Sequence, residues 1–343
     1  MANTFFKSFS ESDRTSSRTL LHEAIPITGT LVSGTYNNNE NIKSFSHGMF
    51  KSVYDYPYLS SSANHIFDVS YGYSSASTYL ATTNVQHDKK RSMYNQMAQV
   101  LAGYDTRSKV RAFDSDGNYS TTGDKFHDAY FVSFSRLLVK DEIKKGSFSM
   151  TFGTASAYAT ALNDVLTITD VEATGNYKIN SPAGEYGLLK DHAGNKFGLI
   201  YYQAGLAVLT SSVLGDGDGT HVRLNTSNYS QKQMTTGSTL DAINDGFIHR
   251  VANISFNNTT ELNSTIYFCR ANHNEFNYSS NPTYISGSKV VVKANDLMMP
   301  PRSYVTTVGL YSADNALLAV AKLSEPLRKD PTNELTLRVR LDY

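Results

Sequence analysis

Apolar and polar residues alternate with period two at many places in this chain, which puts every second side chain on one face of a strand. The clearest stretch ends the sequence and has apolar residues at Leu335, Leu337, Val339, Leu341 and Tyr343. Two further stretches group Phe148, Met150 and Phe152 in one set and Ala252, Ile254 and Phe256 in another. These patterns predict half-buried strands of antiparallel sheets.

Other short runs are rich in β-branched and aromatic residues and are bounded by Gly, Asn, Asp or Pro. They are centred on Val132, Ile200, Val208, Ile266 and Val291. Such runs are typical of strands. We therefore expect a mainly β fold of antiparallel sheets with a sandwich-like arrangement.

One stretch has helical periodicity instead. From Asn84, a good N-cap, to Gly103, a good stop, apolar residues recur at helical spacing. The sequence therefore predicts one long amphipathic helix near residues 84–103, packed on a sheet. Short helical turns are also expected at residues 140–145 and 296–299, the second ended by Pro300 and Pro301.

Domain boundaries are weakly marked, because the chain has neither an internal repeat nor a low-complexity linker. Residues 146–246 are rich in Gly, Asn, Ser and Thr, whereas the flanks hold the predicted helix and the strongest strands. This contrast favours a discontinuous core domain, residues 1–145 plus 247–343, with an inserted β module at residues 146–246. A single meandering β body is the alternative.

Composition narrows the functional classes. The chain has 343 residues, 40% of them apolar, enough for one large or two ordinary domains with a core. The 31 basic residues balance the 31 acidic ones, so no net charge favours a nucleic acid or a membrane as partner. A single cysteine excludes internal disulfides and suits a reducing cytoplasm. Neither export by a signal peptide nor a spanning helix is expected.

The known catalytic and phosphate-binding motifs are missing, and no catalytic, cofactor or metal residues are predicted. Asp216 and Asp218, in the sequence GDGDGTH, offer oxygens to a hard cation, but Ser227 stands where an EF-hand needs a glutamate. A glycine-containing surface loop is the simpler interpretation. A glycan hydrolase would need two carboxylates roughly 5 to 10 Å apart, and Asp55, Asp68 and Glu185 are candidates that the sequence cannot pair.

Other reactive side chains also have ordinary structural interpretations. Scattered histidines lack the close spacing of metal ligands and include His22, His47, His65, His192 and His273. Cys269 lies in an apolar run and is expected in the core. Residues 89–91, Lys-Lys-Arg, are expected to form a solvated first helical turn. The tyrosine-rich segment VYDYPYL, residues 53–59, fits a contact segment and core packing equally well.

The C-terminal quarter contains the most distinctive sequence segments. Residues 276–283 read FNYSSNPT, residues 306–311 TTVGLY, residues 317–323 LLAVAKL and residues 338–343 RVRLDY, and Ser312 to Asn315 are predicted to turn a hairpin. Together with residues 47–73 and 92–105, these segments resemble virion structural proteins of T4-like contractile-tailed phages, especially those of marine cyanobacteria. The hairpin segment also resembles hairpins of phage tail fibre proteins.

This resemblance implies a structural protein of a tail, baseplate or neck, made in the infected bacterial cytoplasm and incorporated in the virion. It implies no enzyme and no cofactor. Its partners would be other phage structural proteins, and a homo-oligomer or ring component is expected. The residues 1–30 and the last hairpin are hypothesised contact elements. The alternatives are a host-recognising or carbohydrate-binding fibre module and, third, a virion-borne glycan hydrolase.

Overall fold

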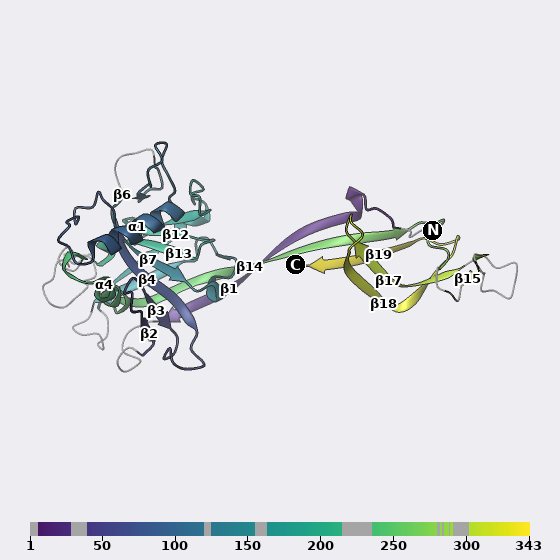
Figure 1. Cartoon of the computed structure of the whole chain (residues 1–343), viewed down its shortest axis with the longest axis horizontal. Helices are drawn as coiled ribbons and strands as arrows, with labels where there is room; N and C mark the ends of the chain where they lie inside the picture. The colour runs from purple at the N-terminus through teal and green to yellow at the C-terminus, as the bar shows by residue number, and fades with distance from the viewer. Residues whose placement is uncertain are drawn as a thin grey trace. The chain divides into compact units, whose positions relative to one another are not determined.

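The structure is a computed structural model that describes residues 6–28, 40–119, 125–154, 163–214, 235–279, 282, 285–287, 289–290 and 302–343. The fold is mainly β, as predicted, and its strand pairs are antiparallel. The chain divides into two compact units, unit 1 from residues 1–20 and 261–343 and unit 2 from residues 21–260. Two long strands, β1 (Arg14–Thr28) and β14 (Val251–Ala271), contribute to both units and are neighbours in the sheet (Figure 1).

This division differs from the expected one. Residues 146–246 do not build a sheet of their own, because β9 pairs with β14 at one end and β13 pairs with β7 at the other. Unit 1 is formed from two separate stretches of the chain, and unit 2 is the continuous stretch between them.

Unit 2 is built on one large sheet with the strand order β14-β9-β10-β11-β12-β13-β7-β4-β3-β2. The bounds of these strands other than β14 are β2 Ile42–Ser44, β3 Lys51–Tyr54, β4 His65–Tyr73, β7 Asp128–Phe134, β9 Ser149–Thr154, β10 Asn163–Thr169, β11 Tyr186–Lys190, β12 Lys196–Tyr201 and β13 Leu206–Thr210. Strands β9 to β13 are consecutive neighbours, which is the pattern of a meander. Short loops join β11 to β12 and β12 to β13, whereas residues 170–185 connect β10 to β11.

The sheet curls until distant strands face each other. The ring of Phe134 on β7 lies 5.7 Å from that of Phe148 and 5.3 Å from that of Phe256 on β14. Five strands separate β7 from β14 in the sheet order. These aromatic contacts therefore close the sheet around a shared core, to which Met150, Phe152 and Ile254 also contribute.

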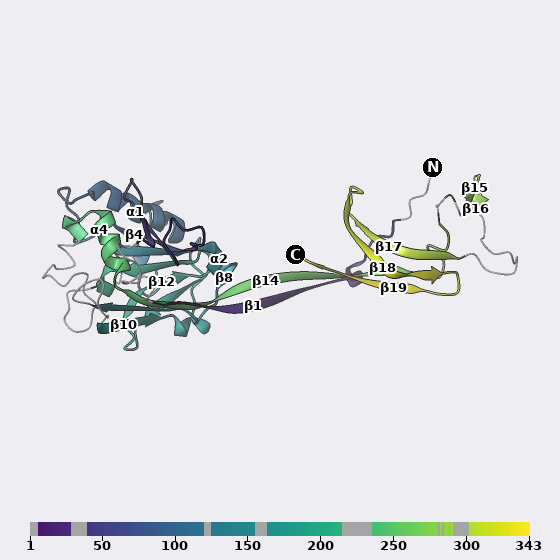
Figure 2. The same cartoon turned by 90° about the horizontal axis from the view of Figure 1, so that it is seen from below.

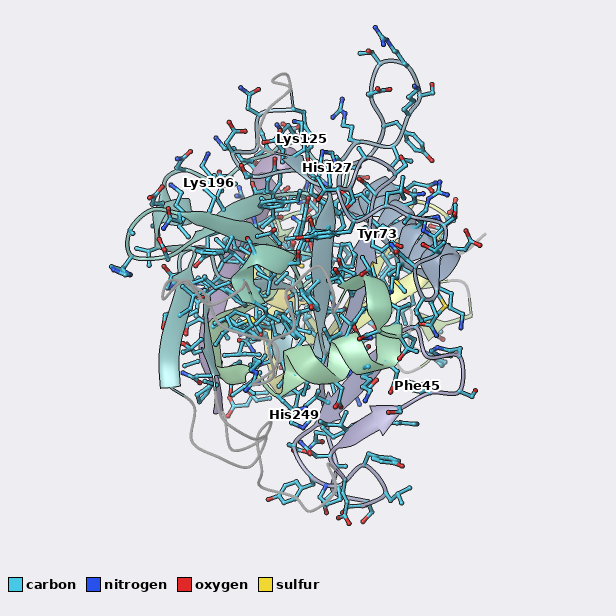
Figure 3. All side chains as sticks on the ribbon, turned by 90° about the vertical axis from the view of Figure 1, so that its left-hand side faces the viewer. Phe45, Tyr73, Lys125, His127, Lys196 and His249 are labelled. Atoms are coloured by element: carbon cyan, nitrogen blue, oxygen red, sulfur yellow. The ribbon has the colours of Figure 1, made fainter. Side chains whose placement is uncertain are left out.

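Two helices cover opposite faces of this sheet. Helix α1 (His87–Leu101) packs on β4 and β7 and buries Met93, Tyr94 and Leu101. Helix α4 (Leu240–Ile248) packs on β4 and β3, and its Phe247 stacks on Tyr130 at 4.6 Å. Figure 3 shows α4 in front of the strands, with His249 at its end.

The prediction of one long amphipathic helix is therefore not confirmed. Helix α1 starts at His87, because the Asn84 side chain donates to the carbonyl of Tyr79 and belongs to the preceding turn. It is also not the only helix of the described residues, since α4 covers the other face. The predicted stop is present: Gly103 adopts a positive φ of 75° directly after the helix.

The approach of α1 to the sheet is unusually close at Gly72 of β4. A Cβ atom at this position would lie 2.6 Å from the backbone nitrogen of Tyr94 and 2.7 Å from the backbone oxygen of Lys90. Only glycine allows two backbones to approach so closely. Gly72 therefore sets the distance between helix and sheet.

The remaining elements of unit 2 are short. They are the strands β5 Phe113–Asp114, β6 Lys125–Phe126 and β8 Glu142–Ile143, the helix α2 Arg136–Val139, and the 3-10 turns η4 Val171–Thr174 and η5 Ser211–Leu214. The helical turn expected at residues 140–145 lies earlier, at α2, because Lys140 has a positive φ of 58° and ends it. The turn expected at residues 296–299 and the strand expected around Val291 lie outside the described residues.

Unit 1 combines the ends of the chain. After the turn η1 (Glu11–Asp13), β1 pairs with β14, and β14 pairs on its other side with β19 (Leu335–Asp342). The hairpin of β17 (Ser303–Tyr311) and β18 (Leu317–Lys329) lies beside β19 in both views (Figure 2). A small hairpin, β15 (Ile285–Ser286) with β16 (Lys289–Val290), completes the unit.

Candidate interaction surface

The β17–β18 hairpin has one face toward the rest of unit 1 and one face toward solvent. Leu310 is buried and is paired with the half-buried Ala319, whereas their neighbours Gly309 and Val320, which are also paired, are exposed. The predicted turn is present at Ser312 to Asn315, and Asn315 adopts a left-handed φ of 59°. The hairpin prediction is therefore confirmed.

The solvent-facing side of this hairpin is apolar near its tip. Tyr311 is 45% exposed, Leu317 53%, Leu318 69% and Val320 51%. The ring of Phe6, itself 51% exposed, lies edge-on against Tyr311 at 5.0 Å. We name these five residues the hairpin patch: Phe6, Tyr311, Leu317, Leu318 and Val320.

The local backbone brings the members of the hairpin patch together. The pairing slips by one residue between Leu310 and Tyr311, so that both Leu317 and Leu318 lie opposite Tyr311. The Tyr311 ring lies over Gly309, since a Cβ atom there would be 2.8 Å from a ring carbon of Tyr311 and 3.4 Å from a methyl carbon of Leu317. An aromatic ring thus shields the glycine backbone on the exposed face.

Unit 1 has very little core beneath this surface. Among its described residues, the buried apolar side chains are Leu310 and Val339. Strand β19 shows the predicted alternation, but its apolar residues Leu335, Leu337 and Leu341 are only half-buried. The apolar side chains that the described part of unit 1 buries therefore contribute little to its stability.

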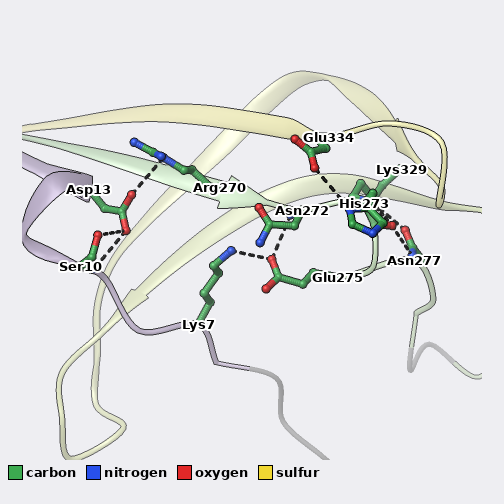
Figure 4. Close-up of polar contacts among 10 residues, drawn as sticks. All are labelled: Lys7, Ser10, Asp13, Arg270, Asn272, His273, Glu275, Asn277, Lys329 and Glu334. Atoms are coloured by element: carbon green, nitrogen blue, oxygen red, sulfur yellow. Dashed lines mark hydrogen bonds and ion pairs between the residues drawn. The ribbon is translucent and has the colours of Figure 1, made fainter.

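Polar contacts hold the N-terminal segment in place within unit 1 (Figure 4). The ammonium of Lys7 lies 2.6 Å from a carboxylate oxygen of Glu275, and Arg270 on β14 lies 3.0 Å from Asp13. The hydroxyl and backbone N–H of Ser10 donate to Asp13, and these hydrogen bonds lower the pKa of Asp13.

A buried lysine fixes the loop that follows β14. The side chain of Lys329, fully buried at the end of β18, donates to the amide oxygen of Asn277 at 2.7 Å and to the carbonyls of Asp330 and His273 at 3.0 and 3.3 Å. Three acceptors satisfy the three donors of a lysine ammonium. These hydrogen bonds fix the loop that carries Glu275 to the end of β18 (Figure 4).

Only part of the tyrosine-rich segment of residues 53–59 is buried in the core. Val53 is buried in β3, but Tyr56 is 52%, Tyr58 37% and Leu59 86% exposed. Asp55 accepts hydrogen bonds from the backbone and side chain of Asn64 and holds the base of this loop. The segment thus presents a second set of exposed apolar side chains, on unit 2.

The candidate carboxylates have local partners. Asp55 binds Asn64, Asp68 accepts from Ser52 and from His65, and Glu185 lies 2.5 Å from the ammonium of Lys145. Each carboxylate thus has a local contact that explains its position. The contacts found for these acids among the described residues join none of the three to another.

The histidines and the cysteine also have separate positions. His22 bonds to Thr259, His47 stacks on Phe45, and His273 lies 3.4 Å from Glu334. No group of three or more metal-binding side chains is found in the part of the chain that the structure describes. Burial raises the pKa of the Cys269 thiol, which is half-buried on β14 rather than in a core. Asp216, Asp218 and His221 lie outside the described residues.

The prediction of a solvated turn at residues 89–91 is wrong for Lys90. Its side chain is fully buried and donates to the carbonyls of Thr235 at 2.7 Å and Ser238 at 2.8 Å. Burial lowers the pKa of Lys90 to about 8. A basic triplet cannot reveal which of its members points inward, so the sequence held no signal for this lysine.

Sequence reasoning also missed three acids, of which Asp114 and Asp170 are buried and Asp128 is half-buried. Asp170 accepts from the backbones of Gly146 and Phe148 and from the hydroxyl of Tyr202, all within 2.9 Å. Burial raises the pKa of Asp128 to about 6. Asp114 is fully buried and pairs with Lys125, which lies with His127 and Lys196 on one side of unit 2 (Figure 3).

Comparison with known protein families, with curated proteins and with solved structures finds no match. Among the described helices, none has the length and apolar character needed to cross a bilayer. The geometry of unit 1 is therefore the basis for a functional proposal.

Proposed function

We propose that this protein is a structural component of a tailed-phage particle, in the tail, baseplate or neck, and that it functions by assembling with other proteins. The observation that carries the proposal is the hairpin patch, an apolar surface on a unit whose described residues bury only two apolar side chains, Leu310 and Val339. Exposed contiguous apolar surfaces on soluble proteins are characteristic of interaction sites. The resemblance to virion proteins supports a phage particle as the assembly; it is carried by residues 47–73 and 92–105 and by the C-terminal segments 276–283, 306–311, 317–323 and 338–343.

The N-terminal contact element expected from the sequence has matching features. Residues 14–24 of β1 are exposed, and β1 is the last strand of the sheet order. An exposed edge strand is a template for pairing with a strand of another protein. Both proposed contact elements, the hairpin patch and the first part of β1, lie in unit 1.

The proposal is tested with a phage that encodes this chain. One phage preparation carries the wild-type chain, and a second carries the double variant Leu318→Asp, Val320→Asp instead. Particles of both are purified by density gradient, and their proteins are identified by mass spectrometry. We expect the wild-type chain in the particle at a fixed stoichiometry and the variant depleted at least about tenfold, since two buried charges cost several kcal/mol. A wild-type chain that stays in the lysate and is absent from particles would contradict the proposal.

Two matched controls sharpen this test. Leu59→Asp and Leu137→Asp place the same charge at apolar positions of unit 2 that are 86% and 81% exposed. Deletion of Met1 to Thr15 removes Phe6 and the start of β1. We expect the point variants to enter the particle and the deletion to remain soluble but to be excluded.

One observation favours a second function, recognition of a host glycan. The exposed side chains Tyr56 and Tyr58 project from a loop whose base is fixed by Asp55 and Asn64, and tyrosine combines an apolar face with a polar tip. A glycan array probed with the wild-type chain and with Tyr56→Ser, Tyr58→Ser tests this function. Binding that the double variant loses would favour recognition, and an array without binding would exclude the glycans that it contains.

A further inference from the structure

We infer that Lys125 and Asp114 form an intramolecular isopeptide bond, an amide between the Nζ atom of Lys125 and the Cγ atom of Asp114. This bond is a covalent modification of unit 2 and does not depend on the proposed assembly function. The inference rests on the contact between the two side chains, on their burial, and on a second carboxyl group beside them.

The backbone places the two side chains against each other. Strands β5 and β6 pair antiparallel, and Asp114 lies directly opposite Lys125 in this pairing. Residues opposite each other in an antiparallel pair have their side chains on the same face of the sheet. The Nζ atom of Lys125 contacts the Oδ2 atom of Asp114. An amine held against a carboxyl group reacts as if in one molecule, with effective concentrations that reach about 10⁵ M or more.

Burial favours the uncharged forms that react. The side chain of Asp114 is 0% exposed and that of Lys125 is 17% exposed. The flanking residues Phe113 and Phe126 are buried, and the Nζ atom of Lys125 lies 5.5 Å from the centre of the Tyr119 ring. Burial raises the pKa of the Asp114 carboxyl group, against the smaller opposing effect of Lys125. Such a site also keeps out the water that would hydrolyse an amide.

Asp116 is the second carboxyl group and can accept a proton. Its backbone N–H donates to the Oδ1 atom of Asp114 at 3.0 Å, and its own Oδ1 atom accepts from the backbone N–H of Asn118 at 2.7 Å. A hydrogen bond between the two carboxyl groups lowers the pKa of Asp116 and adds to the effect of burial on Asp114. The shared proton therefore belongs to Asp114, and Asp116 is a carboxylate.

The reaction needs only these three side chains. Transfer of a proton from the Lys125 ammonium to the Asp114 carboxylate gives a neutral amine and a neutral acid. The amine nitrogen attacks Cγ of Asp114, and a C–N bond forms. Asp116 takes a proton from this nitrogen and returns one to the hydroxyl group on the same carbon, which leaves as water when its C–O bond breaks. The products are one amide and one water molecule, and Asp116 regains its starting state.

The bond would fix a hairpin that is weak without it. Strands β5 and β6 have two residues each, and an isolated two-stranded hairpin is at best marginally stable in water. The hairpin packs on helix α1, where the Phe113 ring lies edge-on against Tyr94 at 5.5 Å. A covalent link between the strands would keep this cover on the helix.

The first test is the intact mass of the denatured wild-type chain. We expect a mass lower than that of the sequence by one water molecule. Trypsin should also fail to cleave after Lys125, because an acylated lysine carries no charge. Lys145 is the control within the same chain: it lies 2.5 Å from Glu185, but these side chains are 23% and 31% exposed, and cleavage after Lys145 should be normal.

A second digestion excludes the other way to lose water, which is ring closure of Asp116 on the nitrogen of Gly117. Chymotrypsin cleaves the denatured chain after Phe113, Tyr119 and Phe126 and releases residues 114–119 and 120–126. The isopeptide bond keeps these two peptides joined, whereas ring closure leaves them separate. A chain with the full sequence mass, or two separate peptides, overturns the inference.

Two variants test the roles of the side chains. Lys125→Arg keeps the positive charge but has no reactive amine, so its mass should equal that of its sequence; a chain that still lacks one water overturns the inference. Asp116→Asn removes the proton acceptor and should slow formation of the bond at least about tenfold. The cross-linked fraction is measured directly after purification and again after days in buffer, and circular dichroism confirms folding. An Asp116→Asn chain that is fully cross-linked from the start overturns the role of Asp116.

Discussion

Phe6 and Tyr311 come from opposite ends of the sequence, and their rings meet edge to face with 5.0 Å between centroids and 66° between planes. This contact joins the N-terminal segment to the tip of the β17–β18 hairpin within unit 1. Two ion pairs, Lys7 with Glu275 and Asp13 with Arg270, hold the same N-terminal segment. The hairpin patch is therefore a composite surface, and neither chain end forms it alone.

The contact predicts energetic coupling between the two rings. Phe6→Ala and Tyr311→Ala should each destabilise unit 1, and the double variant should cost less than the sum by about 0.5–1.5 kcal/mol, the usual worth of an aromatic pair. Chemical denaturation at one low protein concentration measures this double-mutant cycle. Strictly additive effects would show that the rings do not interact.

Gly72→Ala should strongly destabilise unit 2. The added methyl would lie 2.6 Å from the backbone nitrogen of Tyr94 and 2.7 Å from the carbonyl oxygen of Lys90, so α1 must move away from β4. Overpacking of this kind costs about 1–3 kcal/mol, and backbone contacts place this site at the upper end. Thermal unfolding followed by circular dichroism measures the effect. Gly48→Ala is the control for adding a methyl without crowding, since no atom lies within 4 Å of that site; its positive φ of 62° adds only a local backbone cost.

Removing the side chain of Asp170 should lower the free energy of unfolding more than removing the Tyr202 hydroxyl that donates to it. Tyr202→Phe removes one hydrogen bond to its carboxylate and should cost about 1–3 kcal/mol, whereas Asp170→Ala leaves the hydroxyl and the N–H groups of Gly146 and Phe148 without their acceptor. We expect Asp170→Ala to cost at least about twice as much. Equal free energies of unfolding for the two variants would contradict this order.

Because of Asp128, unit 2 should be more stable in mildly acidic solution than at neutral pH. Burial raises its pKa in the folded chain from 3.8 to about 6, so the folded state binds the proton more tightly than the unfolded state. Its contribution to stability therefore falls as the pH rises from about 4 to about 6 and is constant above, with an upper limit of about 3 kcal/mol.

The variant Asp128→Asn isolates this effect from other titrating groups. It should be more stable than the wild type at pH 7 and should lose the difference toward pH 4. Denaturation curves of both chains at several pH values give the comparison. A difference that does not vary with pH would show that the carboxyl ionises normally in the folded chain.

The strands with one buried face could be predicted from the sequence, because burial of every second residue leaves a period of two. This holds for β9, with Met150 and Phe152 inside, and for β19, whose exposure alternates along its length. It fails at the start of β14, where an irregular pairing between Val251 and Asn253 buries Val251 instead of Ala252. Helix α4 was missed because it is only nine residues long and contains Gly246, which lowers the helix propensity of the segment.

The candidate surface could be predicted only in part. The turn at Ser312 to Asn315 identified the hairpin, but the extra residue at Leu317 and Leu318 shifts the outward face and is not visible as a pattern. The division into units was also hidden. Strands β1 and β14 continue through both units, so no linker marks the boundary.

The interleaving of the two units has a consequence for the order in which the protein forms during synthesis. The residues of unit 2 end at Thr260, whereas unit 1 includes β19, which ends at Asp342. On a ribosome, domains fold as their residues emerge, so the core-rich unit can fold first while the hairpin patch is still being translated. A chain released early would contain a folded unit 2 without the surface proposed for association. Polypeptides that stop short would then be kept out of the growing assembly.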